Sequence, residues 1–304
     1  MSVSKSIDSQ EHLDFSNIRD WDIVVAPEAI PAERYAAEEF QRWFGQATGL
    51  ELPLRSSVEA ARHHVYIGPT AAALDPTTMG EEELRMVVES DRIIIAGGRP
   101  RGTLYGVYQF LEDFVGVRFL TYDHTHIPEA SALKVSASSA GLSLPKSTRR
   151  IPCGTHTCNP PLSFRWSYYR ENAEHPEFAA RLRVNTVTSD ERLGGKTGQT
   201  LINHSFHWLV PFSQYGAAHP EYYALVDGAR DTRTHGGGPQ LCVTNPEVIE
   251  IAAASAVKYL NDHPDVKNVS VSQADTNAYC RCDSCEELNQ REGSPMGSQL
   301  TFVN

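Results

Sequence analysis

Over its first 138 residues the chain alternates short apolar runs with amphipathic segments. Residues 22–26 (DIVVA), 52–54 and 64–67 (HVYI) are apolar runs bounded by turn formers, which predicts three strands. Residues 31–48 carry apolar side chains on one face at helical spacing, behind a proline at the first helical position. Gly49 is a natural stop for this predicted helix.

The next predicted elements complete one layer of strands and one of helices. Residues 85–89 and 92–96 flank a two-residue turn and predict a β-hairpin. Residues 102–116 again show helical spacing, and residues 133–135 predict a last strand. Two helices packed on one sheet make a two-layer α+β domain.

These elements divide the chain into four predicted parts. Residues 1–20 form a disordered polar arm, and residues 21–138 form the two-layer domain. Residues 139–150 are rich in serine with one proline, which indicates a linker. Residues 151–304 form a second domain, in which the order of predicted strands and helices is different.

Strands alternate with helices in this second domain, which is typical of parallel βαβ units. We therefore predict an α/β protein whose second domain is an incomplete (β/α)8, TIM-like barrel. The pattern supplies about half of the eight repeats and breaks off within a helix, so we expect the front part of a larger protein. Strands are predicted at residues 163–169, 184–188, 203–208 and 268–273, and helices at residues 176–183 and 246–260.

Net charge and hydropathy limit the kinds of partner that the chain is expected to bind. The chain of 304 residues has 27 Lys and Arg against 38 Asp and Glu, a formal net charge of -11. This surplus repels phosphate backbones and anionic lipids, so neither nucleic acid nor a membrane is an expected partner. No stretch approaches the ~18 apolar residues of a membrane span, and no signal peptide is visible. We expect a cytoplasmic protein, or a secreted or periplasmic one if the start is assigned too far downstream; a homo-oligomer stays open.

Several sequence segments resemble those of known protein families. The segments AERYAAEEFQRWFGQATGLELPL, VYIGPT and RIIIAGGRPRGTLYGVYQFLEDFVGVRFL are similar to the accessory domain that precedes the barrel in family 20 hexosaminidases and family 67 alpha-glucuronidases. The segments HSFHWLVP, HPEYYALVDGARD, QLCVTNPEV and VSQADTNAYCRCDSC resemble the bacterial domain of unknown function 4838. The resemblance implies a glycoside hydrolase-like protein that acts on carbohydrate, such as a uronic acid or amino sugar glycoside, without a catalytic cofactor.

Glycoside hydrolysis uses two carboxyl groups across the scissile bond, and a barrel carries them at the C-terminal ends of its strands. Asp275 follows one predicted strand, and Asp190 and Glu191 follow another. These three residues are the candidate catalytic groups. An Asx turn or a helix cap is the alternative for each of them.

The segment at residues 203–208 combines groups that suit a sugar. Asn203, His204, His207 and Trp208 offer an amide, two imidazoles and an indole for hydroxyl groups and apolar C–H faces. In a strand the two histidines would point to opposite faces. The alternative is a capped, partly buried loop.

Three further residues on the predicted barrel strands are candidate substrate-binding groups: Arg165, Trp166 and Asn185. An arginine there can bind a uronate carboxylate through paired hydrogen bonds. An ion pair at the base of the barrel explains Arg165 equally well.

Cysteines form the densest chemical cluster. Cys280, Cys282 and Cys285 lie within six residues and can share one tetrahedral Zn²⁺, with Cys242 or a histidine as the fourth ligand. Such a zinc would be structural, bracing the loop after Asp275. One disulfide plus a thiol, or simply reduced cysteines, are the alternatives.

Three hypotheses follow: a glycosidase, a non-catalytic carbohydrate-binding protein, and a zinc-stabilised structural domain. A pocket that contains both Asp275 and residues 203–208 favours the first two. A second carboxyl group within ~5 to 10 Å of Asp275 favours the glycosidase. The chain alone is expected to be inactive or unstable, because an open half-barrel exposes sheet edges.

Overall fold

The chain divides into two compact units, Met1–Lys196 and Thr197–Asn304. The predicted strand at residues 133–135, and all of the predicted linker except Arg150, lie outside the described residues. The computed structural model describes residues 12–14, 18–58, 63–128, 150–201, 203–233 and 238–304.

The first unit contains most of the strands. Its helices and helical turns are α1 (Pro31–Thr48), η2 (Pro76–Thr78), α2 (Gly102–Phe110), η3 (Leu111–Val115), α4 (Arg170–Glu174), α5 (Pro176–Arg181) and η5 (Glu191–Leu193). Its strands are β1 (His12–Asp14), β2 (Asp22–Val25), β3 (Leu54–Arg55), β4 (His64–Ile67), β5 (Leu84–Val88), β6 (Arg92–Gly97), β7 (Arg118–Phe119), β8 (Thr125–His126), β9 (Arg150–Pro152) and β10 (Gly154–Cys158).

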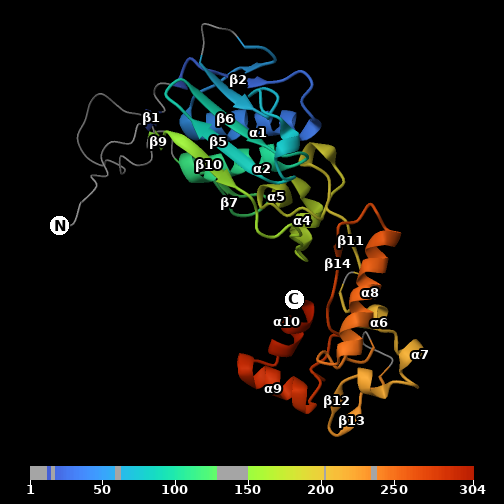
Figure 1. Ribbon diagram of the computed structural model, residues 1–304. Coiled ribbons are helices and arrows are strands. Elements are labelled where there is room, and N and C mark those ends of the chain that lie inside the picture. The colour runs from blue at the N-terminus through green and yellow to red at the C-terminus, as the bar shows by residue number, and fades with distance from the viewer. Residues whose placement is uncertain (1–11, 15–17, 59–62, 129–149, 202, 234–237) are drawn as a thin grey trace, which may run out of the picture. The chain divides into compact units, whose positions relative to one another are not determined.

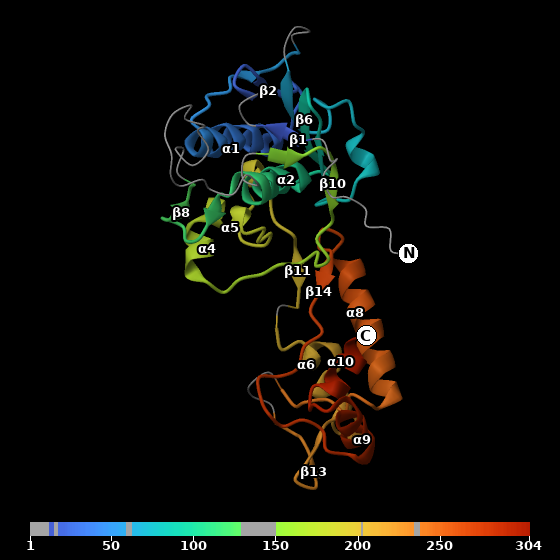
Figure 2. The same ribbon diagram turned by 90° about the vertical axis from the view of Figure 1, so that its left-hand side faces the viewer.

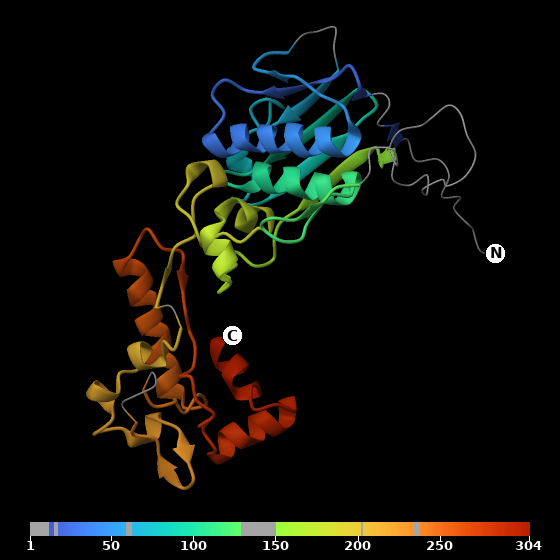
Figure 3. The ribbon, with the colours of Figure 1, turned by 180° about the vertical axis from the view of Figure 1, so that it is seen from behind.

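A six-stranded sheet in the order β10-β5-β6-β4-β2-β3 forms the centre of this unit (Figure 1). Strands β3, β2, β4 and β6 run parallel, and β5 and β10 are antiparallel to their neighbours. Helices α1 and α2 lie side by side against one face of the sheet (Figure 3). The two-layer arrangement predicted for the N-terminal part is therefore present.

Helix α1 shows why the sequence pattern was informative here. Phe40 and Phe44, four residues apart, are fully buried and stack with ring centroids 5.1 Å apart. Burying each such side chain contributes about 1.5–3 kcal/mol. Gly49 ends the helix in the left-handed conformation, with φ 71°. The predicted bounds of the helix are confirmed.

The predicted hairpin and second helix are also present. β5 pairs with β6 in antiparallel register, joined by a hydrogen bond from Glu89 N to Arg92 O of 2.9 Å. α2 runs into the π-helical turn η3, and Gly116 ends it with φ 86°. Together α2 and η3 cover residues 102–115 of the predicted helix at residues 102–116.

The first unit extends further along the chain than the predicted boundary at residue 150. Strand β10 pairs with β5 from Gly154↔Val88 to Cys158↔Leu84, so it is the sixth strand of the sheet. Helices α4 and α5 also belong to this unit, which ends at Lys196.

The strands predicted at residues 163–169 and 184–188 are wrong, because both segments are irregular. Side chains form hydrogen bonds with backbone N–H and C=O groups that would pair with a neighbouring strand in a sheet. The Asn185 carboxamide accepts from Arg165 N at 3.0 Å, and the Thr186 hydroxyl donates to Arg165 O at 3.2 Å. Such local bonds compete with a sheet ladder.

Two consecutive glycines close this unit and offer a matched stability test. Gly194 and Gly195 both have positive φ, 82° and 66°. A Cβ on Gly194 would lie 2.1 Å from Arg101 Cγ, whereas one on Gly195 would meet nothing within 4 Å. Arg101 cannot move away easily, because it is buried and donates to Glu82 at 2.9 Å and to Gly194 O at 3.0 Å.

We expect Gly194→Ala to lower the free energy of unfolding by at least about 1 kcal/mol more than Gly195→Ala, because overpacking costs about 1–3 kcal/mol. Both variants share the backbone strain of about 1–2 kcal/mol. Urea unfolding of the two variants measures the difference. Equal midpoints would contradict the packing of Arg101 against Gly194.

The second unit is built mainly from helices and short turns. Its helices and helical turns are α6 (Phe206–Leu209), α7 (Phe212–Tyr215), η6 (Pro220–Tyr222), α8 (Pro246–Asp262), α9 (Asp283–Glu292) and α10 (Gly297–Val303). Its strands are β11 (Gln199–Thr200), β12 (Leu225–Val226), β13 (Ala229–Arg230) and β14 (Asn268–Val269).

Strands β11 and β14 run parallel and lie side by side, with α8 along β14 (Figure 2). They and the intervening α8 form one β-α-β crossover, the connection that parallel strands need. Asn245 caps α8 by accepting from Glu247 N at 3.0 Å, so the predicted helix at residues 246–260 is confirmed. The described residues of this unit do not form the predicted series of parallel strand-helix repeats, and a TIM-like barrel is not established.

The predicted strand at residues 268–273 is shorter than expected, since only Asn268 and Val269 pair with β11. Within the described segments of both units, no helix has the length and apolar character that crossing a membrane requires.

Candidate functional site

The two parallel strands of the second unit end at the same edge, and the segments that follow them stay together. Phe206 N donates to Ser272 O at 3.1 Å, and Ser272 N donates to the Ser205 hydroxyl at 2.9 Å. The His204 ring nitrogen Nδ1 lies 2.9 Å from Gln273 O. This contact brings the predicted sugar-binding segment beside the loop that carries Asp275.

The backbone before His204 is held in an uncommon conformation. Leu201, Asn203 and His204 all have positive φ, at 52°, 56° and 45°. Residues other than glycine pay about 1–3 kcal/mol each for such conformations, which persist where surrounding structure fixes them and which cluster at functional sites. The fully buried Ser205, bonded to Ser272, supplies that constraint here.

Gln273, whose backbone oxygen contacts His204, has a carboxamide that is only partly satisfied. Its Nε2 donates to the Tyr279 hydroxyl at 3.2 Å, and its buried Oε1 has no donor among the described residues. A buried acceptor without a donor costs about 1–3 kcal/mol.

Asp275 is exposed, and a buried clamp fixes the backbone around it. The fully buried Gln240 donates from Nε2 to Ala274 O at 2.8 Å and accepts from Ala274 N at 3.2 Å. The same Nε2 reaches Thr276 O at 3.1 Å. Asp275 itself has no ion-pair partner among the residues that the structure describes, so its carboxylate is available to solvent. We call His204, His207, Gln273, Asp275 and Tyr279 the strand-end cluster.

The predicted strand at residues 203–208 is wrong, because this segment is a turn followed by helix α6. Phe206, Leu209 and Val210 are buried at helical spacing, and that packing decides the conformation. His207 Nδ1 lies 2.6 Å from the backbone oxygen of His204, a contact between residues three apart that an extended strand would not allow. Trp208 is 53% exposed, with its ring 4.9 Å from that of His207.

Asp231, a buried carboxylate next to this loop, was not among the residues predicted for the site. Arg233 donates to both its oxygens and also to the Thr276 hydroxyl. Burial raises the pKa of Asp231, but hydrogen bonds from Arg233 and Gln240 outweigh it and leave the pKa below its usual value. Asp231 therefore stays ionised and holds Arg233 against the loop. Asp231 ends the segment HPEYYALVDGARD, but it lies 45 residues before Thr276, and nothing in the sequence indicates that the two residues meet.

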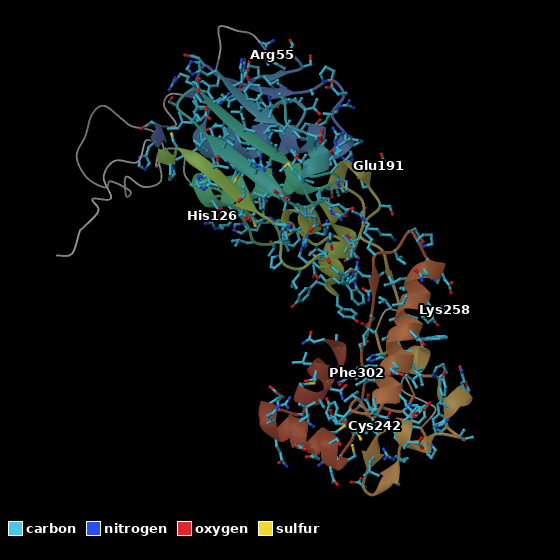
Figure 4. All side chains as sticks on the ribbon, in the orientation of Figure 1. Arg55, His126, Glu191, Cys242, Lys258 and Phe302 are labelled. Carbon is cyan, nitrogen blue, oxygen red and sulfur yellow. The ribbon has the colours of Figure 1, made fainter. Side chains whose placement is uncertain are left out.

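The other two candidate catalytic residues, Asp190 and Glu191, lie in the first unit. Asp190 caps η5 by accepting from Arg192 N, and the Arg192 guanidinium bonds the same carboxylate at 2.6 Å. These hydrogen bonds lower the pKa of Asp190, so it does not suit the proton donor of a general acid. Glu191 is exposed at the first position of η5 (Figure 4). The helix-cap alternative holds for Asp190.

Arg165 and Asn185 are engaged inside the first unit. Arg165 forms an ion pair with Glu82 at 2.6 Å, and Asn185 Nδ2 donates to the same carboxylate at 2.8 Å. Asn185 is 2% exposed and makes three hydrogen bonds, so it has little capacity left for a substrate. Trp166 is 40% exposed and lies 4.3 Å from the Tyr168 ring.

The first unit also has a cavity of about 470 Å³ that sequence analysis missed. Tyr122 stacks on His175 at its edge, with ring centroids 4.0 Å apart. Tyr169 is 76% exposed and lines the cavity with Asn172. The aromatic residues of the segment SFRWSYY were the available signal, but they were assigned to a strand.

Four cysteines of the second unit gather at a separate place: Cys242, Cys280, Cys282 and Cys285. Their sulfur atoms all lie within 4.8 Å of one another, and Figure 4 marks Cys242 where yellow sulfur atoms gather. Hydrogen bonds from Cys280 and Cys285 lower the pKa of Cys242, and the same contact raises the pKa of Cys280 to about 11. We call these residues the four-cysteine cluster; they are the four ligands that the sequence analysis predicts for zinc.

The chain belongs to the family described as domain of unknown function (DUF4838), whose model matches residues 119–304, more than half of the chain. The predicted resemblance to that family is confirmed. The match begins inside the first unit and continues through the whole second unit. No curated protein matches the sequence.

Several solved carbohydrate enzymes show distant similarity. The N-acetyl-beta-hexosaminidase of Streptomyces plicatus is 14% identical to this chain, with a TM-score of 0.37. The match covers 83% of this chain and 54% of the hexosaminidase. A GH115 4-O-methyl-alpha-glucuronidase is 12% identical to this chain, with a TM-score of 0.39. The match covers 93% of this chain and 40% of the glucuronidase. The GH20 exo beta-N-acetylglucosaminidase of Vibrio harveyi is 15% identical to this chain, with a TM-score of 0.33. The match covers 59% of this chain and 23% of the glucosaminidase.

The chain thus spans between 23% and 54% of the length of these three structures. TM-scores below 0.5 do not establish a common fold, and the likenesses assign no activity to this chain.

Proposed function

We propose that this chain is part of a glycoside hydrolase-like protein that acts on carbohydrate through the strand-end cluster. The observation that carries the proposal is the hydrogen bond between His204 Nδ1 and Gln273 O. This bond holds the segments after two parallel strands together, and ligands in open parallel sheets bind at the carboxyl ends of the strands.

The groups of the cluster suit a polyhydroxylated ligand. Imidazole, amide and phenol groups donate to and accept from hydroxyls, while the exposed Trp208 ring beside His207 offers a face for apolar C–H groups. Asp275 is the group we assign to proton transfer, because it is the exposed carboxylate of the cluster. In the barrel that we propose, β11 and β14 are two of its parallel strands, joined through α8.

A non-catalytic carbohydrate-binding role is the second candidate. Hydrolysis requires two carboxyl groups. Asp231, the other carboxylate bonded into this loop, is occupied by Arg233. The described residues of the cluster therefore supply one exposed carboxylate, which is enough for binding.

The test compares sugar binding by the chain and by its Asp275→Asn variant. We expect methyl glycosides of N-acetylglucosamine or glucuronic acid to show saturation-transfer NMR signals with the wild-type chain. Asp275→Asn should weaken the affinity about tenfold or more, because a hydrogen bond to a charged group contributes about 1.5–3 kcal/mol. The exposed Asp265 supplies the matched control, Asp265→Asn, with unchanged affinity.

Hydrolysis separates the two candidates. Release of nitrophenol from the 4-nitrophenyl glycosides of the same sugars, abolished by Asp275→Asn, supports the glycosidase. Binding without release is expected for the second candidate, and equally for a glycosidase whose second carboxyl group this chain does not supply. If neither sugar class binds, or if the two Asp→Asn variants behave alike, the strand-end cluster is not a carbohydrate site.

A further inference from the structure

The four-cysteine cluster joins two parts of the chain that are far apart in sequence. Cys242 lies in the turn before α8, and the other three cysteines lie at and before the start of α9, some 40 residues later. Three of the four side chains are at most 5% exposed, and Cys282 is half-buried. The cluster is thus enclosed within the second unit.

The spacing of the sulfur atoms fits one tetrahedral metal ion. Four thiolates about 2.3 Å from a Zn²⁺ ion lie roughly 3.8 Å from one another. Cys242 Sγ and Cys282 Sγ are 3.6 Å apart, and no pair in the cluster exceeds 4.8 Å. A disulfide needs sulfur atoms about 2.05 Å apart, and these four cysteines are not disulfide-bonded.

Neighbouring groups are arranged as they are around metal-bound thiolates. Leu225 N lies 3.3 Å from Cys280 Sγ as a donor, and the Thr244 hydroxyl lies 3.1 Å from Cys285 Sγ. Cys282 is the cap residue of α9, and Cys285 lies in its first turn. The positive end of a helix stabilises negative sulfur. Second-shell donors of this kind orient and tune metal ligands.

The fold of the second unit also needs such a link. Its strands have two residues each, and three of its few buried core residues are the cysteines themselves. Small units with limited cores are often held by a disulfide or a structural metal. Reduced cysteines packed as small apolar side chains are the alternative.

We propose that the four-cysteine cluster binds one Zn²⁺ ion as a structural, tetrathiolate site. Four protein ligands leave no open position, so the ion holds segments together and does not activate water.

The same site supports the loop of the strand-end cluster. Cys242 follows Gln240 by two residues, and Gln240 clamps Ala274 on both its amide and its carbonyl. Cys280 follows Asp275 by five residues. Zinc would therefore fix the chain on both sides of Asp275, whichever ligand the strand-end cluster binds.

The first test measures metal in the wild-type chain purified under reducing conditions without added chelator. Elemental analysis should find one zinc per chain. Replacement by Co²⁺ should give the visible absorption of a tetrahedral tetrathiolate site and a sulfur-to-cobalt charge-transfer band. Less than stoichiometric zinc together with no such cobalt spectrum overturns the proposal, and stoichiometric iron overturns the choice of metal.

The second test uses Cys282→Ser. Serine is a preferred helix cap, so this variant preserves the start of α9 and removes only a sulfur ligand. We expect loss of the cobalt spectrum and at least tenfold weaker zinc binding in competition with a chromophoric chelator. Cys158→Ser, at an exposed thiol of β10, should keep both properties. If Cys282→Ser binds zinc as tightly as Cys158→Ser, the cluster is not the site.

Discussion

Arg181→Met is expected to lower the free energy of unfolding of the first unit by about 3–5 kcal/mol, because it leaves a buried carboxylate without its counter-charge. Arg181 and Glu39 form a two-bond ion pair at 2.9 and 3.1 Å, with side chains 10% and 3% exposed. Methionine keeps most of the volume and removes the charge.

Glu39 cannot recover this loss from its other partners. It accepts from Trp43 Nε1 at 3.1 Å and from the Tyr108 hydroxyl at 3.2 Å, both through the oxygen Oε2. These are neutral donors, which do not compensate a buried charge as a guanidinium does. Urea unfolding followed by tryptophan fluorescence measures the effect, since Trp43 contacts the pair directly.

Arg42 gives the matched control. It also lies over the Trp43 ring and near Glu39, but its side chain is 57% exposed and its nitrogen is 4.0 Å from the carboxylate. Arg42→Met should cost about 0–1 kcal/mol, the range of exposed ion pairs. The double variant Glu39→Leu/Arg181→Met should recover most of the stability. Equal losses in Arg42→Met and Arg181→Met would show that the buried pair does not hold α5 against α1.

This ion pair also explains why the domain boundary was hard to predict. Sequence patterns end the first domain before residue 139, at a serine-rich stretch. The structure continues it to Lys196, because arginines of the later segment pair with glutamates of the earlier one. Arg183 bonds Glu112 at 2.8 Å, in addition to the Arg181–Glu39 pair. Periodicity does not encode which charges meet.

The first unit was otherwise predictable because its helices and strands have one buried face. β5 alternates buried and half-buried residues from Leu84 to Val88, and α1 repeats its buried aromatic residues at helical spacing. The segment at residues 163–169 has the same apolar content, but Trp166 and Tyr169 are exposed. Its aromatic residues predicted a strand, but the side chains of Asn185 and Thr186 bond the backbone of Arg165 in its place.

The candidate site was predictable to the extent that its residues are near in sequence to a strand end. Asp275 lies six residues after the end of β14, and His204 lies four residues after the end of β11. Parallel pairing of the two strands brings the segments that follow them together. Arg165 and Asn185 were assigned to the site from strands that do not exist. Asp231 and Gln240 were missed, since their hydrogen bonds depend on tertiary packing that no local motif announces.

Removal of zinc from the proposed four-cysteine site is expected to have the largest effect on the second unit. Structural zinc in small peptides contributes about 10–16 kcal/mol of apparent binding free energy, which is comparable to the whole stability of a domain. We therefore expect the metal-free second unit to lose the packing of α9 against the turn before α8, while the first unit keeps its fold.

Arg281 is a built-in probe of this change, because it is exposed and lies between the ligands Cys280 and Cys282. Trypsin cleavage after Arg281 should accelerate at least about tenfold when a chelator removes the metal, corresponding to 1.4 kcal/mol or more of lost protection. Cleavage after Arg170, whose side chain is 83% exposed in the first unit, should not change. Added zinc should restore slow cleavage in the wild-type chain but not in Cys282→Ser. If zinc leaves and cleavage after Arg281 stays slow, the packing of side chains, and not the metal, holds this loop.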